Sequence, residues 1–271
     1  RPDYRVESII RDVFSPFSPN FIDFTSDSRD IKYIDCLWID MTSPIDELML
    51  SKLPNLRYVV SPTTGLTHLS PISNSSRDIE IFSLRGDSQF LETITATPEL
   101  AWSLALTVWR QIIPASESYI NDIAIRQRFS SKQLNGLTVG LIGFGRIGRM
   151  LKNYSQAFGM KTIFFDPYLP KQDEACYKGA IQSESISEVC KESDILFLVA
   201  SHDANQETSY PILKREHLVK LRSEAIVINV SRGSLLDEHA LFELIKSNKI
   251  AGAGLDVLAR EEKPKTASRL D

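Results

Sequence analysis

Short runs of β-branched and aromatic residues alternate along the chain with stretches in which apolar residues recur every three or four positions. The first kind of run predicts buried strands and the second predicts amphipathic helices, so the alternation favours a parallel α/β architecture. In the first third we expect helices over residues 4–14 and 44–53, and strands over 33–39, 57–60 and 79–82. Ser43 is the expected N-cap of the second helix, with Pro44 at its first position.

The pattern changes near residue 95. Thr97 is placed to cap a helix with Pro98 at its first position, and a wide apolar stripe follows at three- and four-residue steps. The stripe consists of Leu100, Ala101, Leu104, Ala105, Val108, Trp109 and Ile112. A helix with so wide a stripe is expected to lie between two bodies. We therefore expect two domains, residues 1–94 and residues 95–271.

The rest of the chain repeats the alternation around a glycine loop. The expected strands cover residues 138–142, 161–165, 195–199, 225–230 and 252–257. The first of them runs directly into Gly143-Phe144-Gly145-Arg146-Ile147-Gly148, and a helical stripe follows this GxGxxG. Asp166 comes at the end of the next strand, 18 residues after Gly148. Strand, glycine loop, helix, strand and acid in this order predict a Rossmann dinucleotide-binding site.

Each part of this pattern has a physical role in dinucleotide binding. Glycines permit a tight turn and let the backbone approach a pyrophosphate, whose charge is stabilised at a helix N-terminus. The carboxylate of Asp166 can accept hydrogen bonds from ribose hydroxyls, and it would repel a 2′-phosphate. A purely structural glycine turn would not need the helix and the acid in register. The sequence therefore predicts NAD as the cofactor.

Composition and charge exclude several other classes of protein. The 31 basic and 35 acidic residues give a net charge of −4 without a basic stripe, which argues against a nucleic-acid partner. No apolar run approaches the ~18 residues that a membrane span needs, and no apolar signal core follows residues 1–5. Cys36, Cys176 and Cys190 lie far apart, with no CxxC or Cys/His cluster, so we expect no metal site and reduced thiols.

Several motifs together resemble the D-isomer-specific 2-hydroxyacid dehydrogenases, over about residues 53–261. They are the glycine loop with residues 133–140 before it, residues 157–161 and 166–168, residues 228–233 with 236–238, and residues 252–257. The resemblance implies an α/β fold of two doubly wound parallel-sheet domains. Residues 1–94 would form a flavodoxin-like substrate (catalytic) domain, and residues 95–271 a Rossmann NAD-binding domain. It also implies that both ends are incomplete, and that the protein is a cytoplasmic homodimer.

The resemblance implies hydride transfer between NAD(H) and C2 of a small 2-hydroxy or 2-oxo acid of D configuration. Arg232 matches the arginine that binds the substrate carboxylate and carbonyl, a task for which a planar charged fork is suited. Thr64 and Gly65 match positions whose backbone N–H groups hold the carboxylate. Glu261 matches the acid that keeps a catalytic histidine protonated, with Glu262 as the alternative. The cofactor-binding positions are Gly143, Gly145, Arg146, Ile147, Gly148, Asp166, Val230, Ser231, Arg232 and Asp256.

No histidine follows Glu261 in the 271 residues, so we expect the chain to stop before the catalytic one. We interpret His68 as structural and His202 as a polar loop residue in the region that passes near the nicotinamide. His217 and His239 fall among charges on expected helices and are expected to be solvated. The alternative function is an NADH-sensing binding protein on the same fold, as in the family's corepressor branch, where catalytic-looking residues also survive.

Overall fold

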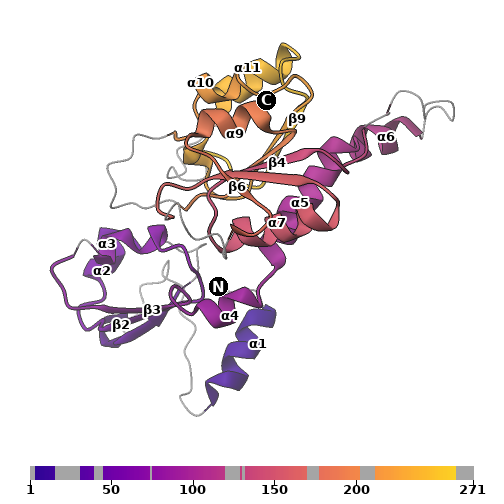
Figure 1. Cartoon of the computed structure of the whole chain (residues 1–271). Helices are drawn as coiled ribbons and strands as arrows, with labels where there is room; N and C mark the ends of the chain where they lie inside the picture. The colour runs from indigo at the N-terminus through magenta and orange to yellow at the C-terminus, as the bar shows by residue number, and fades with distance from the viewer. Residues whose placement is uncertain are drawn as a thin grey trace. The chain divides into compact units, whose positions relative to one another are not determined.

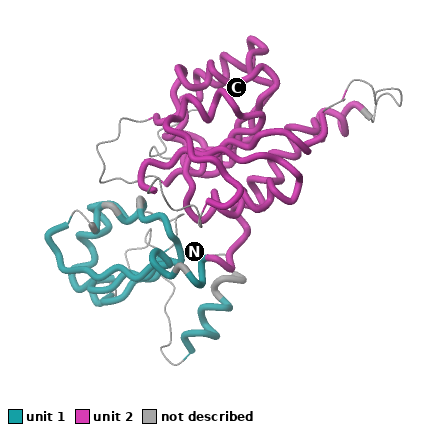
Figure 2. Tube along the Cα trace, viewed as in Figure 1, with its two compact units in different colours: residues 1–91 teal, residues 92–271 magenta. Residues whose placement is uncertain are grey.

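The structure, a computed structural model, consists of two compact units that are considered separately below (Figure 2). Unit 1 is Arg1–Leu91 and unit 2 is Glu92–Asp271, so the division falls three residues before the boundary expected from the sequence. The residues that the structure describes are 4–15, 31–39, 45–73, 75–119, 129, 132–169, 177–201 and 211–260.

Unit 1 is built on a small parallel sheet in which the strands β1 (Cys36–Trp38), β2 (Tyr58–Ser61) and β3 (Glu80–Ser83) lie in chain order. Consecutive placement of this kind is found in each half of a doubly wound sheet. Leu37 and Val59 are buried on one face of the sheet. The helical segments of the unit are α1 (Tyr4–Val13), η2 (Ile31–Tyr33), α2 (Glu47–Ser51), η3 (Thr67–Leu69), α3 (Ser70–Ser73) and α4 (Ser88–Glu92).

The start of α2 differs from the sequence expectation. Asp46 is its N-cap, and its Oδ1 accepts a hydrogen bond from Met49 N–H at 2.6 Å. A carboxylate there also complements the partial positive charge of the helix N-terminus. The expected cap Ser43 and Pro44 lie outside the described residues. Asp46 therefore defines where this helix begins.

Unit 2 is a Rossmann domain. Its strands are β4 (Thr138–Ile142), β5 (Lys161–Phe165), β6 (Ile181–Gln182), β7 (Ile195–Leu198), β8 (Ile226–Asn229) and β9 (Gly252–Leu255). They form one parallel sheet in the order β6-β5-β4-β7-β8-β9, in which the strand order reverses between β4 and β7. Strands β4, β6 and β9 of this sheet are labelled in Figure 1. The bounds expected for β4 and β5 are confirmed. The two-residue edge strand β6 was not predicted. Strands β7, β8 and β9 end one or two residues before their expected ends, and β8 begins one residue later than expected.

Helices cover both faces of this sheet, as expected of a doubly wound fold. The helical segments are α5 (Ala96–Trp109), α6 (Ile112–Tyr119), α7 (Arg146–Ala157), α9 (Ile186–Glu192), α10 (Arg215–Leu218), η5 (Gly233–Leu235) and α11 (Glu238–Lys246). One cluster of buried residues joins α5 and α7 to the sheet through residues such as Leu141, and a second joins α9, α10 and α11 to the opposite face through residues such as Ile142. The alternation of Leu141 and Ile142 between faces follows the two-residue period of a strand.

Helix α5 begins earlier than the expected helix, but most of the expected stripe faces the core: Ala101, Ala105 and Trp109 are buried, and Leu104 and Val108 pack against the same cluster. It starts at Ala96 after Thr95, whereas Thr97 was expected to cap it. Leu100 and Ile112 of the expected stripe are exposed, while Trp102 is buried and stacks on Phe197 with 5.9 Å between ring centroids. The helix is apolar nearly all round, so the sequence shows that it is helical but does not fully determine which side faces the core.

Candidate active site

The segments that carry the predicted cofactor-binding residues meet at one edge of the unit 2 sheet. Four strands end in register there: Ile142 of β4 pairs with Leu198 of β7, Leu198 with Asn229 of β8, and Asn229 with Leu255 of β9. On the other side of β4, Ile142 pairs with Phe165 of β5. The carboxyl ends of the strands, next to the reversal of strand order, are where open α/β sheets bind ligands.

Two glycines of the loop after β4 are required by the protein's own packing. Gly143 has φ +97°, and a Cβ on it would lie 2.7 Å from the backbone of Ala200. A Cβ on Gly148 would lie 2.6 Å from the carbonyl oxygen of Gly143. Any side chain at either position would therefore push the turn away from its neighbours.

Gly145 has a different reason to be glycine. It is the N-cap of α7 with φ −69°, a value open to any residue, and a Cβ on it would meet nothing within 4 Å. The first hydrogen bond of the helix runs from Arg149 N–H to Gly145 O at 3.0 Å, so the N–H groups of Ile147 and Gly148 point out of the helix end. The open space above Gly145 fits a pyrophosphate drawn close to these donors. The loop thus fits NAD.

The different environments of these glycines predict different effects of the same substitution. Gly145→Ala is expected to lower the melting temperature only slightly, since alanine is a poorer N-cap than glycine. It is expected to weaken NADH binding about tenfold or more, because the methyl group would occupy ligand space. Gly148→Ala is expected to lower both the melting temperature and the affinity, because its methyl group meets backbone. Thermal unfolding and NADH fluorescence titration of both variants measure this. Equal losses of melting temperature in the two variants would contradict it.

Asp166 follows β5 and lies directly beside the glycine loop. Its Oδ2 accepts a hydrogen bond from Phe144 N–H at 2.8 Å, and its Oδ1 accepts one from Tyr168 N–H at 3.0 Å. Phe144 is fully buried and stacks on Phe164 with 3.8 Å between ring centroids. The carboxylate thus ties the loop to the turn after β5, and each oxygen keeps a lone pair for a ribose hydroxyl.

Arg232 lies in the turn after β8. It is half-buried and extended, and its Nη1 donates to the carbonyl oxygen of Ser231 at 2.7 Å. None of the ion pairs among the described residues involves it. Since no acidic partner of Arg232 lies among the described residues, its half-buried guanidinium favours an anionic ligand, because a carboxylate would supply both charge and hydrogen-bond acceptors.

The turn of Arg232 also contacts the chain that leaves β9. Asp256, the first residue after β9, is exposed, and its N–H donates to Asn229 O at 2.9 Å. Gly233 lies against the backbone of residues 258 and 259, where a Cβ would collide with both. Glu238 of α11 accepts a hydrogen bond from Ala259 N–H at 2.7 Å. Gly233 and Glu238 therefore fix the path of the chain as it passes the Arg232 turn.

The predicted substrate loop of unit 1 follows β2 and is held by its own hydroxyl groups. Ser61 Oγ, which is buried, lies 2.9 Å from Thr63 Oγ1 and 3.1 Å from His68 Nε2. Thr63 Oγ1 donates to Gly65 O at 2.9 Å, while Thr64 is exposed at the tip of the loop. The contact with Ser61 agrees with the interpretation of His68 as a structural residue.

Comparisons with known proteins agree with this geometry. The sequence model of the family described as “D-isomer specific 2-hydroxyacid dehydrogenase, NAD binding domain” matches residues 102–270. The chain belongs to this family. It is 32% identical over 235 residues to a D-3-phosphoglycerate dehydrogenase of Methanocaldococcus jannaschii, an alignment that covers 87% of this chain but only 43% of that protein.

The alignments with two further proteins cover more of the length of those proteins. A hydroxypyruvate reductase of Thermotoga maritima is 30% identical over 231 residues, covering 85% of this chain and 71% of that protein. Among solved structures, a D-lactate dehydrogenase from Aquifex aeolicus, complexed with NAD and lactic acid, has a TM-score of 0.80 at 22% identity and covers 98% of this chain and 80% of its own. At that identity the structural likeness shows the fold, which extends over both units.

The structure describes most of the predicted site residues, but not all of them. The glycine loop, Asp166 and the segments with Val230, Ser231, Arg232 and Asp256 lie at the carboxyl edge of the unit 2 sheet. Arg146 begins α7, and its Nη1 donates to Ile94 O at 2.6 Å. Glu261, Glu262 and His202 lie outside the described residues.

Asn229 is the residue that the sequence interpretation missed. It was read only as part of the arginine motif, yet its buried side chain makes three hydrogen bonds within the turn that carries Arg232. A polar residue at the end of an otherwise apolar strand was the available signal. Such a residue is buried only when the following turn satisfies it.

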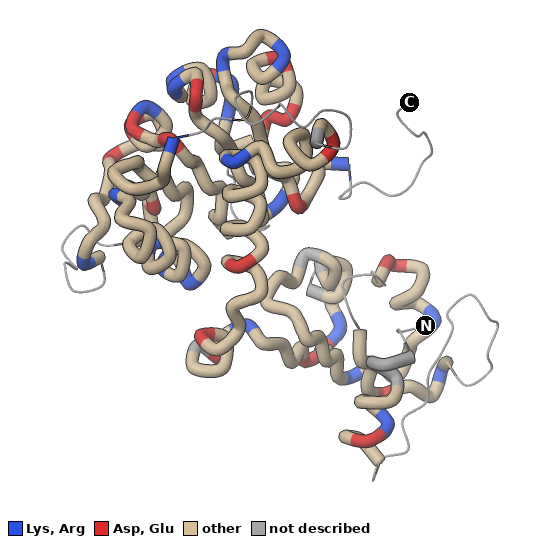
Figure 3. Tube along the Cα trace, turned by 90° about the vertical axis from the view of Figure 1, so that its right-hand side faces the viewer, with Lys and Arg blue, Asp and Glu red and all other residues tan. Residues whose placement is uncertain are grey.

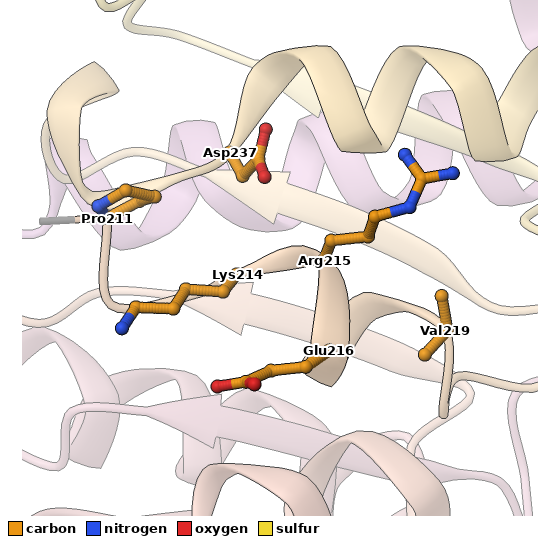
Figure 4. Close-up of a pocket in the computed structure, with 6 residues that line it drawn as sticks. All are labelled: Pro211, Lys214, Arg215, Glu216, Val219 and Asp237. Carbon is orange, nitrogen blue, oxygen red and sulfur yellow. The ribbon is translucent and has the colours of Figure 1, made fainter.

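Other features of the described residues do not suggest a second site. They contain no helix long and apolar enough to cross a membrane, and no group of three or more His, Cys, Asp or Glu residues arranged for a metal ion. Basic and acidic residues are interspersed in the view of Figure 3. The hollow drawn in Figure 4 is lined by none of the predicted binding residues, but by Pro211, Lys214, Arg215, Glu216, Val219 and Asp237. Asp237 caps α11 there by accepting from Ala240 N–H.

Proposed function

We propose that this protein is an NAD-dependent oxidoreductase acting between a 2-hydroxy acid of D configuration and the corresponding 2-oxo acid. The observation that carries the proposal is Arg232, a half-buried guanidinium without an acidic partner among the described residues. It follows a strand whose end is in register with the strand before the glycine loop. An anion-binding residue and a dinucleotide cradle at one sheet edge are what hydride transfer to a carboxylic acid substrate requires.

Within this proposal the residues have separate tasks. NAD(H) would supply the hydride acceptor or donor. Arg232 would bind the carboxylate and the C2 oxygen through its planar fork, and would stabilise the charge that develops on that oxygen. Thr64 and Gly65 would offer backbone N–H groups to the carboxylate. Val230, Ser231 and Asp256 would line the nicotinamide end of the cofactor.

The reduced substrate also needs a proton on its C2 oxygen. A positioned acid typically contributes about 10²–10⁴-fold at such a step. Arg232 cannot be this acid, because a guanidinium does not give up its proton at neutral pH. The resemblance implies that the proton donor is a histidine. We assign to Glu261 the task of keeping that histidine protonated, since a nearby carboxylate raises the pKa of an imidazole.

The named relatives favour an enzyme over an NADH sensor. Those reported above are called dehydrogenases or a reductase, with 3-phosphoglycerate, hydroxypyruvate or D-lactate in their names.

On the basis of the family resemblance, we further propose that the protein is a homodimer in the cytoplasm. Leu100 of α5 and Ile112 and Ile113 of α6 are exposed apolar residues that a second copy could cover, which sedimentation analysis would test.

The test of the proposed function is NADH consumption, followed by absorbance, with a panel of small 2-oxo acids that includes glyoxylate and hydroxypyruvate. The natural protein that contains these residues is expected to oxidise NADH with at least one acid of the panel. Binding of NADH without consumption across the whole panel would contradict an enzyme and favour the sensor.

A further inference from the structure

Asn229 is fully buried at the end of β8, and all of its side-chain hydrogen bonds stay within the next three residues. Its Oδ1 accepts from Ser231 N–H at 3.0 Å and from Ser231 Oγ–H at 2.8 Å. Its Nδ2 donates to Arg232 O at 3.1 Å. The side chain therefore bridges the whole turn between the strand and Arg232.

The chemistry of these bonds calls for a primary amide. The turn presents two donors and one acceptor to the side chain, and a planar amide has both an acceptor oxygen and a donor nitrogen. Aspartate has no donor for the carbonyl oxygen of Arg232, and it would bury a negative charge beside that oxygen. Alanine would leave the buried N–H group of Ser231 without this partner.

The bonds of Asn229 reach the guanidinium of Arg232 through one peptide group. Asn229 fixes Ser231 through its N–H and hydroxyl groups, and fixes Arg232 through its carbonyl oxygen. The peptide between them is thereby held on both sides. Its carbonyl oxygen, Ser231 O, accepts from Arg232 Nη1 at 2.7 Å. The orientation of that carbonyl consequently sets where the guanidinium lies.

We propose that Asn229 is a positioning residue for Arg232, acting through Ser231 without touching the substrate itself. The inference rests on the proposed function, in which Arg232 binds the substrate carboxylate. Since a misplacement of about 1 Å can cost about a hundredfold in rate, a loosened turn would weaken substrate recognition strongly. NADH binding would change less than substrate binding, because the glycine loop and Asp166, which hold the pyrophosphate and the ribose, lie outside this turn.

A double-mutant cycle of Asn229→Ala and Arg232→Ala in the natural protein tests the proposal. Asn229→Ala is expected to lower kcat/KM for the best 2-oxo acid by about tenfold or more, and less than about twofold when Arg232 is already alanine. Oxamate, a 2-oxo acid mimic, should bind the NADH complex about tenfold more weakly in Asn229→Ala, while the Kd of NADH stays within about threefold. Equal fold-losses in both backgrounds would overturn the proposal, because they indicate a general structural role.

Thr162→Val is the matched control, since Thr162 Oγ1 makes a buried hydrogen bond to Ser155 Oγ at 2.7 Å in the same unit. This variant is expected to lose stability without any change in oxamate affinity. If Asn229→Ala does not fold, Asn229→Ser keeps a hydroxyl group at the buried position but removes the donor to Arg232 O, and its loss of oxamate affinity should vanish in the Arg232→Ala background. A loss that persists there would overturn the proposal.

The same cycle separates this inference from the function on which it rests. Absence of turnover by the unmodified protein, or near-normal turnover by Arg232→Ala, would refute the proposed function or its arginine. Full turnover by the unmodified protein, a large loss in Arg232→Ala and none in Asn229→Ala would refute only the role of Asn229.

Discussion

Replacing Arg232 by alanine is expected to lower kcat/KM for a 2-oxo acid at least about a hundredfold. Each charge-assisted hydrogen bond to a carboxylate contributes about 1.5–3 kcal/mol, and the planar fork can make two of them. The half-buried guanidinium has no acidic partner among the described residues, so its loss leaves no unpaired carboxylate behind there. Steady-state kinetics of the natural protein and the variant measure the effect.

Two controls sharpen this result. The Kd of NADH is expected to hardly change in Arg232→Ala, because the loss concerns substrate recognition. Arg232→Lys is expected to recover little of the activity, because an ammonium group cannot form the two-pronged contact. Near-normal turnover by Arg232→Ala would show that the substrate carboxylate is bound elsewhere.

NADH is expected to bind about a hundred times more tightly than NADPH. A 2′-phosphate charge at ~4 Å from the Asp166 carboxylate costs about 4 kcal/mol at an effective dielectric constant of ~20, and solvent screening reduces this. The structure strengthens the argument, because Asp166 is held in place by Phe144 N–H and Tyr168 N–H. A carboxylate fixed in this way cannot easily turn aside for a phosphate. Fluorescence titration with both cofactors measures the ratio, and equal dissociation constants would contradict it.

Asp166→Ser is expected to bring the dissociation constants of NADH and NADPH closer together, mainly by weakening NADH binding. The variant loses the carboxylate that would accept from the ribose hydroxyls and that also accepts from Phe144 N–H in the glycine loop. Asp194 provides a matched control, because its Oδ2 accepts from Thr138 N–H at 2.8 Å at the start of β4, away from the ligand edge. Asp194→Ser should lower the melting temperature and leave the ratio of the two dissociation constants unchanged.

The sequence predicted the Rossmann unit well because its central strands β4, β7 and β8 are buried on both faces. Such strands appear as continuous apolar runs with sharp ends. The bounds of β4 and β5 were predicted to the residue, since Gly143 and Asp166 mark where the apolar runs stop. Gly145 and Gly148 could be recognised as glycine positions, but only the structure shows that one borders open space and the other backbone.

Helix starts and buried faces were harder to predict. Thr95 and Thr97 flank the start of α5, and the pattern alone favoured the wrong one. Leu100 and Trp102 are both apolar, and only tertiary packing against Phe197 determines that Trp102 is the buried one. The local sequence shows the apolar periodicity of a helix, whereas the elements that pack against the helix determine which of its apolar residues are buried.

Contacts between distant segments could not be read from the sequence at all. The position of Asp166 predicted a ribose ligand, but its tie to Phe144 depends on the pairing of β4 with β5. The contacts of Asn229 are local, but they depend on the backbone conformation of the four-residue turn, which the residue types of the motif do not specify. Site residues were thus predictable where family motifs name them, and their supports were not.

Isotope transfer tests the central claim most directly. The natural protein would be incubated with hydroxypyruvate and NADH carrying deuterium at both C4 positions of the nicotinamide, and the product analysed by NMR and chiral chromatography. We expect one deuterium at C2 of a 2-hydroxy acid of D configuration, and loss of this product in Arg232→Ala. If other 2-oxo acids are better substrates, the same analysis applies to them. Oxidation of the cofactor without deuterium at C2, or an L product, would contradict the proposed reaction.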